Sequence, residues 1–477
     1  MAKFKPSRKN QLRLPERLDD YVPEEHLSHL VYEIVEMLDT TVIENKYSEK
    51  GQHTYHPKLL LRLLFYGYTT GTRSGRKMAI KCETDTAYMY LAEMYTPDFR
   101  TINDFRRNNL ENIEKHFKGI AKYCKELGMV KLGEISIDGS KIRANASPKR
   151  TKKEEEYEQW LLKIEDEIKQ ILREAEETDQ EEDRKYGDKR GDELPEGLQT
   201  KEALREKIKE VMKKFKAGEE EKKINLTDPD SKFMKDAKGV IDPSYNCQVA
   251  AEGQVILGAD VVTEANDREQ LIPMIETTEE NTGEKVGQVI ADSGYGSYDN
   301  YEYLVSEQKE GYIPDQYFAK IHQGEYEKPE KRYHKENFEY NKERDIYICP
   351  EGKELHFYKE RDSDKGVIKR KQWIYKGKDC RECSKASECT RARYRTISRD
   401  KREGLQEQMR QRLDTEEGKK KRHKRLYTVE PIFGNLKFNL GYRYFLLRTL
   451  EKVRGEFKLM CIGHNIRKIY NYKMATA

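Results

Sequence analysis

The chain has no long hydrophobic run, few cysteines and no surplus of charge of one sign. No segment approaches the roughly 18 to 20 apolar residues that cross a bilayer, and no apolar stretch follows the basic residues 1–6, so we expect no membrane span and no secretory signal. Eight cysteines in 477 residues are too few for a disulfide scaffold. With 91 Lys and Arg against 87 acids, any nucleic-acid-binding surface must come from local segregation of charge. These absences favour a soluble cytoplasmic protein.

Helical patterns fill the first 130 residues of the chain. Residues 56–68 begin with a His-Pro step and are apolar on more than one face. Two further patterns cover about 76–93 and the segment from Thr101 to about 127, with Thr101 as the expected N-cap. Short helices joined by tight turns are typical of a DNA-contacting bundle, and equally of an ordinary packing domain.

Strand patterns begin near residue 131, and they are interrupted by a charged segment. The strand patterns lie at residues 134–138, 245–251, 254–262 and 286–292, with a helix between the last two. Strands followed by a helix and a further strand indicate an α/β fold. The charged segment, residues 151–223, is rich in Glu and Lys. It predicts two solvated helices with a disordered tip at 187–192, and no chemistry of its own. Residues 340–425 read as irregular, and about 426–472 as helical, with an interruption at 434–441.

Two aspartates stand at or near strand ends, Asp138 and Asp292. In open α/β sheets chemistry collects at the carboxyl ends of strands, and carboxylate pairs suit the hard cations Mg²⁺ and Mn²⁺. Glu430, in a helical segment, is the best candidate for a third carboxylate. Lys437 follows it by about two helical turns, so both side chains point the same way and the lysine is placed to hold a DNA phosphate.

Three blocks around these acids resemble the DDE transposases of bacterial insertion sequences. The blocks are Ile-Asp-Gly-Ser-Lys at 137–141, Val-Ile-Ala-Asp-Ser-Gly-Tyr at 289–295, and Val-Glu-Pro-Ile-Phe-Gly from 429 with Lys437 after it. The similarity covers most of residues 20–470 except the charged segment. Where many relatives carry an arginine before the glutamate, this chain has Leu426, and Arg425 lies one residue away.

The resemblance implies an α/β fold with an RNase H-like mixed sheet flanked by helices. The core would comprise residues 131–150, 224–340 and 426–472, after an N-terminal helical domain of residues 1–130 that is expected to contact DNA. A charged helical insertion would span 151–223, and a cysteine-bearing basic insertion 341–425.

It also implies a reaction and its partners. Asp138, Asp292 and Glu430 would hold two Mg²⁺ (or Mn²⁺) ions about 3.5–4 Å apart. Cleavage at transposon ends and strand transfer into target DNA would then be one in-line displacement with different nucleophiles, carried out by a homodimer or larger oligomer on DNA. A non-catalytic DNA-binding relative, and an RNase H-like nuclease without strand transfer, remain as alternatives.

Four of the eight cysteines cluster late in the chain, at Cys349, Cys380, Cys383 and Cys389. A Cys-Pro-x-Gly turn and a Cys-x-x-Cys pair suit a structural Zn²⁺, and the pattern resembles a four-cysteine insertion of one branch of these transposases. Reduced free thiols and a disulfide are the alternatives. The other four cysteines lie in apolar settings and are expected to be packed core thiols.

Basic residues are concentrated just before Glu430. Residues 391–425 hold fourteen Lys and Arg against six acids, a local net charge of +8. Such a segment would neutralise DNA phosphates, unless it is only a solvated loop. Arg425, with Arg443 and Arg448 beyond the glutamate, and Lys437, are therefore the candidate DNA-binding residues.

Overall fold

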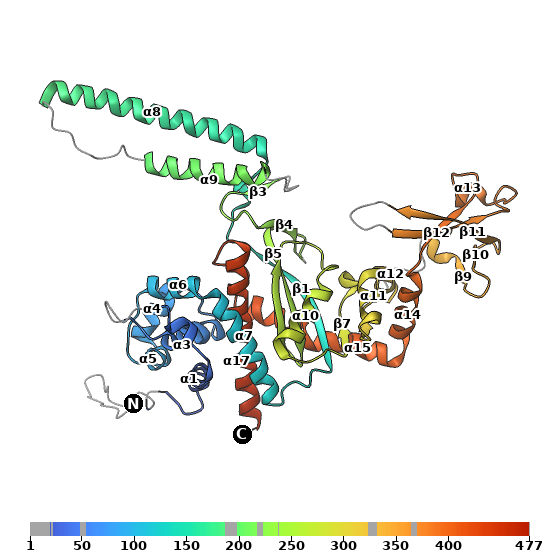
Figure 1. The fold of residues 1–477 in the computed structure, drawn as a ribbon, viewed down its shortest axis with the longest axis horizontal. Coiled ribbons are helices and arrows are strands. Elements are labelled where there is room, and N and C mark those ends of the chain that lie inside the picture. The colour runs from blue at the N-terminus through green and yellow to red at the C-terminus, as the bar shows by residue number, and fades with distance from the viewer. Residues whose placement is uncertain are drawn as a thin grey trace, which may run out of the picture.

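The computed structural model describes residues 20, 22–47, 54–186, 198–216, 223–236, 238–322, 332–363 and 370–476. Figure 1 shows a central sheet with helices around it, a long helical pair projecting from one end, and a second sheet on the opposite side. The basic residues 1–6 and the expected disordered tip at 187–192 lie outside the described residues. Among the described helices, none combines the length and apolarity that crossing a bilayer requires.

Seven helices form the described part of the N-terminal region, and the apolar segment predicted at 56–68 is among them. They are α1 (Leu27–Met37), α2 (Thr41–Glu44), α3 (Pro57–Thr69), α4 (Gly75–Thr84), α5 (Thr86–Leu91), α6 (Phe99–Asn108) and α7 (Leu110–Glu126). Each of the two longer helices expected here is divided into two shorter ones. Asp85 caps the start of α5, and Asn109 separates α6 from α7. Thr101 is not an N-cap: Asp98 takes that role, accepting a hydrogen bond from the Arg100 N–H at 2.7 Å.

The central sheet has the RNase H-like arrangement that was expected. Its strands are β1 (Glu134–Arg143), β4 (Lys232–Lys235), β5 (Ile241–Glu252), β6 (Val255–Val262), β7 (Gln288–Ile290) and β8 (Glu310–Tyr312). Strands β6, β5 and β1 pair antiparallel in that order, and β1, β7 and β8 pair parallel. Strand β4 pairs antiparallel with the first residues of β5, 241–244. The mixed pairing puts β1, which carries Asp138, in the middle of the sheet.

Helices from distant parts of the chain pack around this sheet. They are α10 (Leu271–Thr282), α11 (Tyr298–Ser306), α12 (Gln316–His322), α14 (Glu403–Asp414), α15 (Glu416–Thr428), α16 (Glu430–Gly434), the π-helical turn Asn435–Asn439, and α17 (Leu450–Thr476). Helix α17 is buried along much of its length and packs on α3, α7 and β6, which joins the N-terminal helices and the sheet in one apolar core. The interruption expected at 434–441 falls instead between Asn439 and Leu450.

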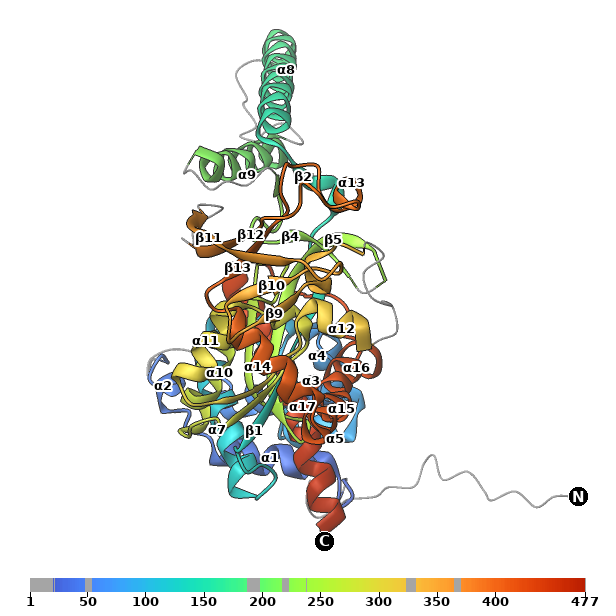
Figure 2. The same cartoon turned by 90° about the vertical axis from the view of Figure 1, so that its right-hand side faces the viewer.

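The charged segment forms a helical pair with a small core of its own. Helices α8 (Glu154–Tyr186) and α9 (Leu198–Lys216) start and end beside the short strands β2 (Thr151–Lys152) and β3 (Ile224–Asn225). Tyr157, Ile164 and Ile208 are buried between the helices near this base. Figures 1 and 2 both show the pair projecting away from the sheet.

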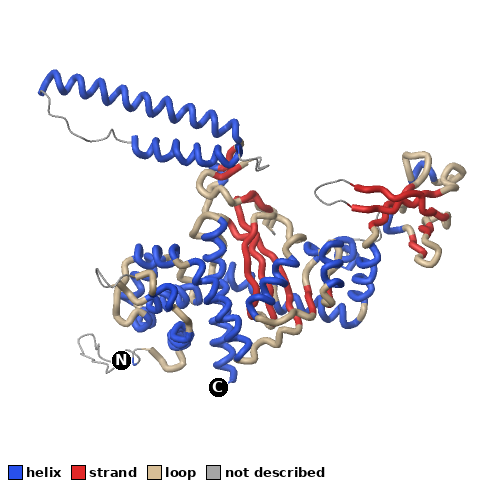
Figure 3. Tube along the Cα trace, viewed as in Figure 1, coloured by secondary structure: helices blue, strands red, loops and turns tan. Residues whose placement is uncertain are grey.

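The cysteine-bearing segment is not irregular, contrary to expectation. It holds a five-stranded antiparallel sheet of β9 (Glu339–Asn341), β10 (Ile346–Ile348), β11 (Glu354–Ser363), β12 (Arg370–Gly377) and β13 (Thr396–Asp400), with the short helix α13 (Ala386–Cys389). Figure 3 shows its strands as a separate group from those of the central sheet. Aromatic residues form its core, with Tyr375 fully buried, and alternating polar residues conceal this pattern in the sequence.

Candidate active site

Asp138 and Asp292 occupy matching places on neighbouring strands. Ser136 of β1 pairs in parallel with Ile290 of β7, and each aspartate lies two residues further along its strand. Side chains in a strand alternate between the two faces of the sheet with a period of two. The two aspartates are therefore on the same face, at the edge where the parallel pair ends. Asp292 begins the turn after β7, where its Oδ1 accepts a hydrogen bond from the Gly294 N–H at 2.8 Å.

The Asp138 carboxylate is largely buried in the middle of the sheet. Burial raises the pKa of Asp138 to about 7; Arg425 opposes the rise, whereas the charges of Asp292 and Glu430 add to it. Its Oδ1 accepts a hydrogen bond from the Gly139 N–H at 3.0 Å. The three acids chosen from the sequence are therefore electrostatic neighbours in the folded chain.

Arg425 links two of these acids. Its Nη1 lies 3.5 Å from Asp138 Oδ1, and its Nη2 donates to Glu430 Oε1 at 2.8 Å. Asp292 and Arg425 line the same pocket. Glu430 is the first residue of α16. The Arg425 side chain of α15 therefore contacts both the sheet, at Asp138, and the start of the next helix.

Helix α15 is held against the sheet by three further polar contacts. Thr428 Oγ1 donates to Ser136 Oγ at 2.8 Å, and Lys424 Nζ pairs with Glu134 Oε1 at 2.6 Å. Lys421 also pairs with Glu134. Contacts at positions 134, 136 and 138 of one strand fix the helix across β1, and this places Glu430 near the aspartates.

The donor set suits a hard divalent cation, although no metal cage is formed. Within the described ranges, no three or more His, Cys, Asp or Glu side chains are grouped so that they could hold a metal ion. The Arg425 guanidinium, bonded to Asp138 and Glu430, supplies the compensating positive charge. A buried Asp138 with a raised pKa, influenced by the charges of Asp292 and Glu430, is the chemistry that Mg²⁺ or Mn²⁺ would complement.

Sequence reasoning missed a fourth carboxylate, Asp267. Its Oδ1 accepts hydrogen bonds from Asn246 Nδ2 and Gln248 Nε2, both at 2.7 Å, and Lys141 Nζ lies 3.3 Å away. The buried Tyr295 hydroxyl in turn donates to Gln248. In the sequence, residues 263–267 resemble a segment that DDE transposases carry between the two aspartates, and this resemblance is the one signal that pointed to Asp267.

Two glycines leave room for this network beside the aspartates. A Cβ at Gly139 would lie 2.4 Å from Gln248 Nε2 and 2.7 Å from Asp267 Oδ1. A Cβ at Gly294 would lie 2.9 Å from Asp292 Oδ1. A side chain at either position would therefore collide with these polar groups, which explains why glycine follows Asp138 and Asp292.

Three of the four candidate DNA-binding residues lie around the far end of β1, whereas Arg425 lies between Asp138 and Glu430. Lys437 Nζ donates to Lys141 O at 2.7 Å and to Ser140 Oγ, and burial lowers the pKa of Lys437. Arg443 Nε donates to Lys437 O at 3.3 Å, and Arg448 Nε donates to Asn145 O at 3.0 Å. Their contact with DNA stays a prediction.

The basic segment 391–425 is not a loop, because most of it forms β13, α14 and α15. Several of its cations are already paired with acids: Arg399 with Glu407, Arg402 with Asp299, Arg410 with Asp315, and Lys421 with Glu134. A high local charge in the sequence therefore corresponds largely to internal ion pairs.

The four late cysteines line one small pocket in the second sheet. The Lys353 N–H donates to Cys349 Sγ at 3.3 Å, and the Arg395 N–H donates to Cys380 Sγ at 3.5 Å. Gly352, in the Cys-Pro-x-Gly turn, has φ +73°, which favours glycine. All eight cysteines are free thiols, so the disulfide alternative is not borne out, and Cys82, Cys124, Cys247 and Cys461 are buried as expected.

Two segments of the chain match known protein families. Residues 348–470 match the model described as a transposase DDE domain, and residues 16–108 match that of a transposase domain (DUF772). The first segment includes Arg425, Glu430 and the four cysteines, whereas Asp138 and Asp292 lie outside both. No curated protein and no solved structure matches the chain.

Proposed function

Because the chain belongs to the DDE transposases of insertion sequences, we propose that it cleaves DNA at transposon ends and transfers the freed strand into target DNA. The observation that carries the proposal is the ion-pair bridge from Arg425 to Asp138 and Glu430, beside Asp292 in the matching place on the next strand. It joins residues nearly 300 positions apart in one cluster of acids.

In the proposed site Asp138, Asp292 and Glu430 would hold Mg²⁺ or Mn²⁺. When bound, a pair of such ions supplies activation of the attacking water or 3′-hydroxyl and stabilises the leaving oxygen. Asp267, tied to Asn246 and Gln248, orients the polar wall beside both aspartates. Lys437 donates hydrogen bonds to Ser140 and Lys141 of β1. From there, Arg443 and Arg448 would extend the surface that contacts DNA.

The remaining parts of the proposal concern zinc, assembly and location. We propose a structural Zn²⁺ on the ligand chemistry of the four cysteines: thiolates suit this ion, the cysteines line one pocket, and two of them accept hydrogen bonds from backbone N–H groups. The ion would stabilise the second sheet and take no part in the reaction. Joining two transposon ends requires at least two copies of the chain, acting in the cytoplasm where bacterial DNA lies.

The test is Mg²⁺-dependent nicking of duplexes that carry the DNA flanking the reading frame. We expect Asp138→Asn, Asp292→Asn and Glu430→Gln each to lower nicking by at least about 100-fold, the scale expected when groups that stabilise transition-state charge are removed. Asp299→Asn and Glu276→Gln make the same chemical changes outside the site and serve as controls. Full activity in any one site variant would remove that residue from the site.

Joining of pre-cut ends separates the proposal from its alternatives. A transposase joins a pre-cut 3′ end to target DNA, an RNase H-like nuclease nicks without joining, and a non-catalytic relative binds DNA but does neither. Joining that persists in all three site variants would overturn the proposed function.

A further inference from the structure

The second sheet carries exposed aromatic side chains. Phe357 and Tyr358 on β11 are 47% and 55% exposed, which is high for large hydrophobic residues. The register between β11 and β12 shifts between Phe357 and Lys359, so Tyr358 is the extra residue of a β-bulge. Bulges redirect a side chain relative to its strand, and residues 357–362 are all exposed.

Four cations surround Tyr358 and a second tyrosine, Tyr394. Lys376 Nζ lies 4.7 Å from the centre of the Tyr358 ring and 4.1 Å from that of Tyr394. Around the Tyr394 ring, the guanidinium carbons of Arg381 and Arg393 lie at 5.6 and 5.5 Å. Lys359 Nζ lies 5.6 Å from the Tyr358 ring. We name Lys359, Lys376, Arg381 and Arg393, with the two tyrosines, the tyrosine–cation surface.

These cations are held by rings and not by acids. Among the described residues, none of the four forms an ion pair with a carboxylate, although Asp379 and Glu382 are near in sequence. Elsewhere in the same region, Arg332, Arg344, Lys385 and Lys401 each pair with a glutamate. A ring face attracts a cation without neutralising it, so the surface keeps its positive charge for an external anion.

We propose that the tyrosine–cation surface binds the phosphodiester backbone of DNA, as a second contact outside the carboxylate site. The inference rests on the proposed function, which makes DNA the substrate and thus the polyanion that this charge complements. Cations already held against aromatic rings lose little side-chain freedom on binding, and each phosphate that they neutralise releases counterions.

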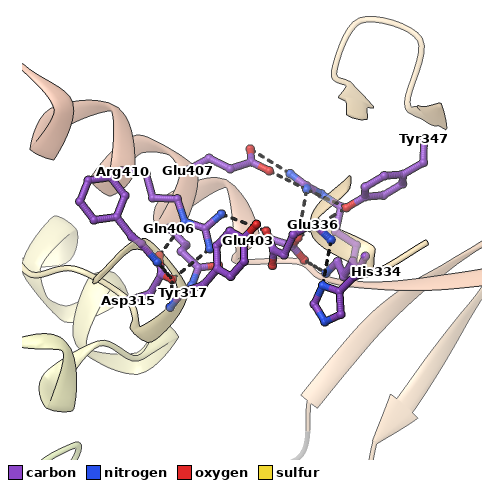
Figure 4. A network of polar contacts seen from close by, with 12 residues as sticks. Asp315, Tyr317, His334, Glu336, Tyr347, Glu403, Gln406, Glu407 and Arg410 are labelled. Atoms are coloured by element: carbon purple, nitrogen blue, oxygen red, sulfur yellow. Dashed lines mark hydrogen bonds and ion pairs between the residues drawn. The ribbon is translucent and has the colours of Figure 1, made fainter. Parts of the chain in front are cut away.

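The second sheet is firmly attached to the core, so this contact has a defined place. Ion pairs join α14 to its neighbours on both sides: Arg410 pairs with Asp315 at 2.6 Å (Figure 4), and Glu407 pairs with Arg399 of β13 at 2.7 Å. Asp315 follows β8, the neighbour of β7. In Figure 1 the second sheet lies beyond α12 and α14, away from β1, so the surface would contact DNA outside the scissile phosphate.

The test compares two fourfold variants of the full-length chain that lose the same charge. The first changes Lys359, Lys376, Arg381 and Arg393 to Gln; the second changes the acid-paired Arg332, Arg344, Lys385 and Lys401 to Gln. Affinity for a labelled duplex is measured across salt concentrations without added divalent metal. We expect the first variant to reduce the slope of log affinity against log salt by about 2 to 4, since each phosphate contact contributes about 0.9, and the second by less than about 1.

A charge-keeping variant separates charge from folding. Arg381→Lys with Arg393→Lys should retain the wild-type slope, and circular dichroism should show the same secondary structure for all variants. An unchanged slope in the first variant, as expected if the surface docks an acidic protein, would overturn the inference; so would an equal fall in the second. Asp138→Asn, assayed in parallel, should keep the slope while losing nicking; nicking by Asp138→Asn would contradict the proposed function and leave the slope comparison standing.

Discussion

Positive charge gathers in two regions of this chain, and the two regions hold it differently. On α15, Lys421 and Lys424 pair with Glu134, and Arg425 bridges Asp138 and Glu430. On the second sheet, Lys376 and its neighbours lie on tyrosine rings, without carboxylate partners among the described residues. The first arrangement uses cations to organise acids inside the protein, and the second leaves cations available to a ligand. Local net charge alone does not distinguish the two cases.

The largest expected effect concerns the cysteines of the second sheet. Cys380→Ser with Cys383→Ser removes two of the proposed zinc ligands, and structural zinc is worth on the order of 10 kcal/mol to small zinc-dependent folds. We expect limited proteolysis to cut residues 332–400 of the variant first, while fragments containing β1 and α17 persist. Zinc content by mass spectrometry and the neighbouring Ser384→Ala variant are the controls. Equal protease resistance with no bound zinc would show that the sheet is stable without metal.

Arg425→Ala should have the next largest effect, on the carboxylate side of the comparison. It leaves Asp138, Asp292 and Glu430 without their compensating cation, which costs on the order of 2 kcal/mol of stability for a partly exposed bridge. Added Mg²⁺ should restore more stability to this variant than to the wild type, because it meets the same acids. Urea unfolding with and without Mg²⁺ measures both quantities, and Arg425→Lys should behave in between. A variant as stable as the wild type without metal would contradict the bridge.

Lys421→Ala should cost less, about 1 kcal/mol. Its partner Glu134 keeps Lys424 as a second cation, so the carboxylate is not left unpaired. The matched control is Lys419→Ala, whose pair with Glu416 is exposed and should contribute little. Thermal unfolding of the two variants side by side tests this difference. Equal decreases in melting temperature would mean that α15 is not held against β1 through Glu134.

The smallest expected effect lies on the second sheet, at Tyr394. Tyr394→Ala removes the ring that orders three cations, and each cation–π contact is worth about 0.5–1 kcal/mol at an exposed site. We expect DNA affinity to fall a few-fold with an unchanged salt slope, because the charges remain. Tyr394→Phe keeps the ring face and should bind like the wild type; a similar loss in both variants would assign the effect to the hydroxyl.

The fold class could be predicted from the sequence, and the three acids could be chosen from it as candidates, because both depend on local patterns. Alternation at 134–138 and the buried segment at 286–292 predicted β1 and β7, and the motifs around Asp138, Asp292 and Glu430 carried a family resemblance. Their proximity in the structure follows from parallel pairing of those strands and from α15 crossing β1.

What the sequence did not predict depends on contacts between distant residues. Asp267 is one acid among 87, and only its bonds to Asn246 and Gln248 distinguish it. Arg425 stands one place from the family's arginine position, yet the turn of α15 brings it to the acids. The second sheet was read as irregular because β9 and β10 are only three residues long and its core is rich in tyrosine, which alternates weakly with charged neighbours.

The most direct measurement of the central claim is Fe²⁺-directed hydroxyl-radical cleavage of the polypeptide, with Fe²⁺ replacing Mg²⁺ in the full-length chain. Radicals act close to the bound ion, so the account predicts cuts near residues 138, 292 and 430 together, suppressed by excess Mg²⁺ and lost in Asp138→Asn. Cuts confined to one of these segments, or located elsewhere in the chain, would contradict a shared metal site.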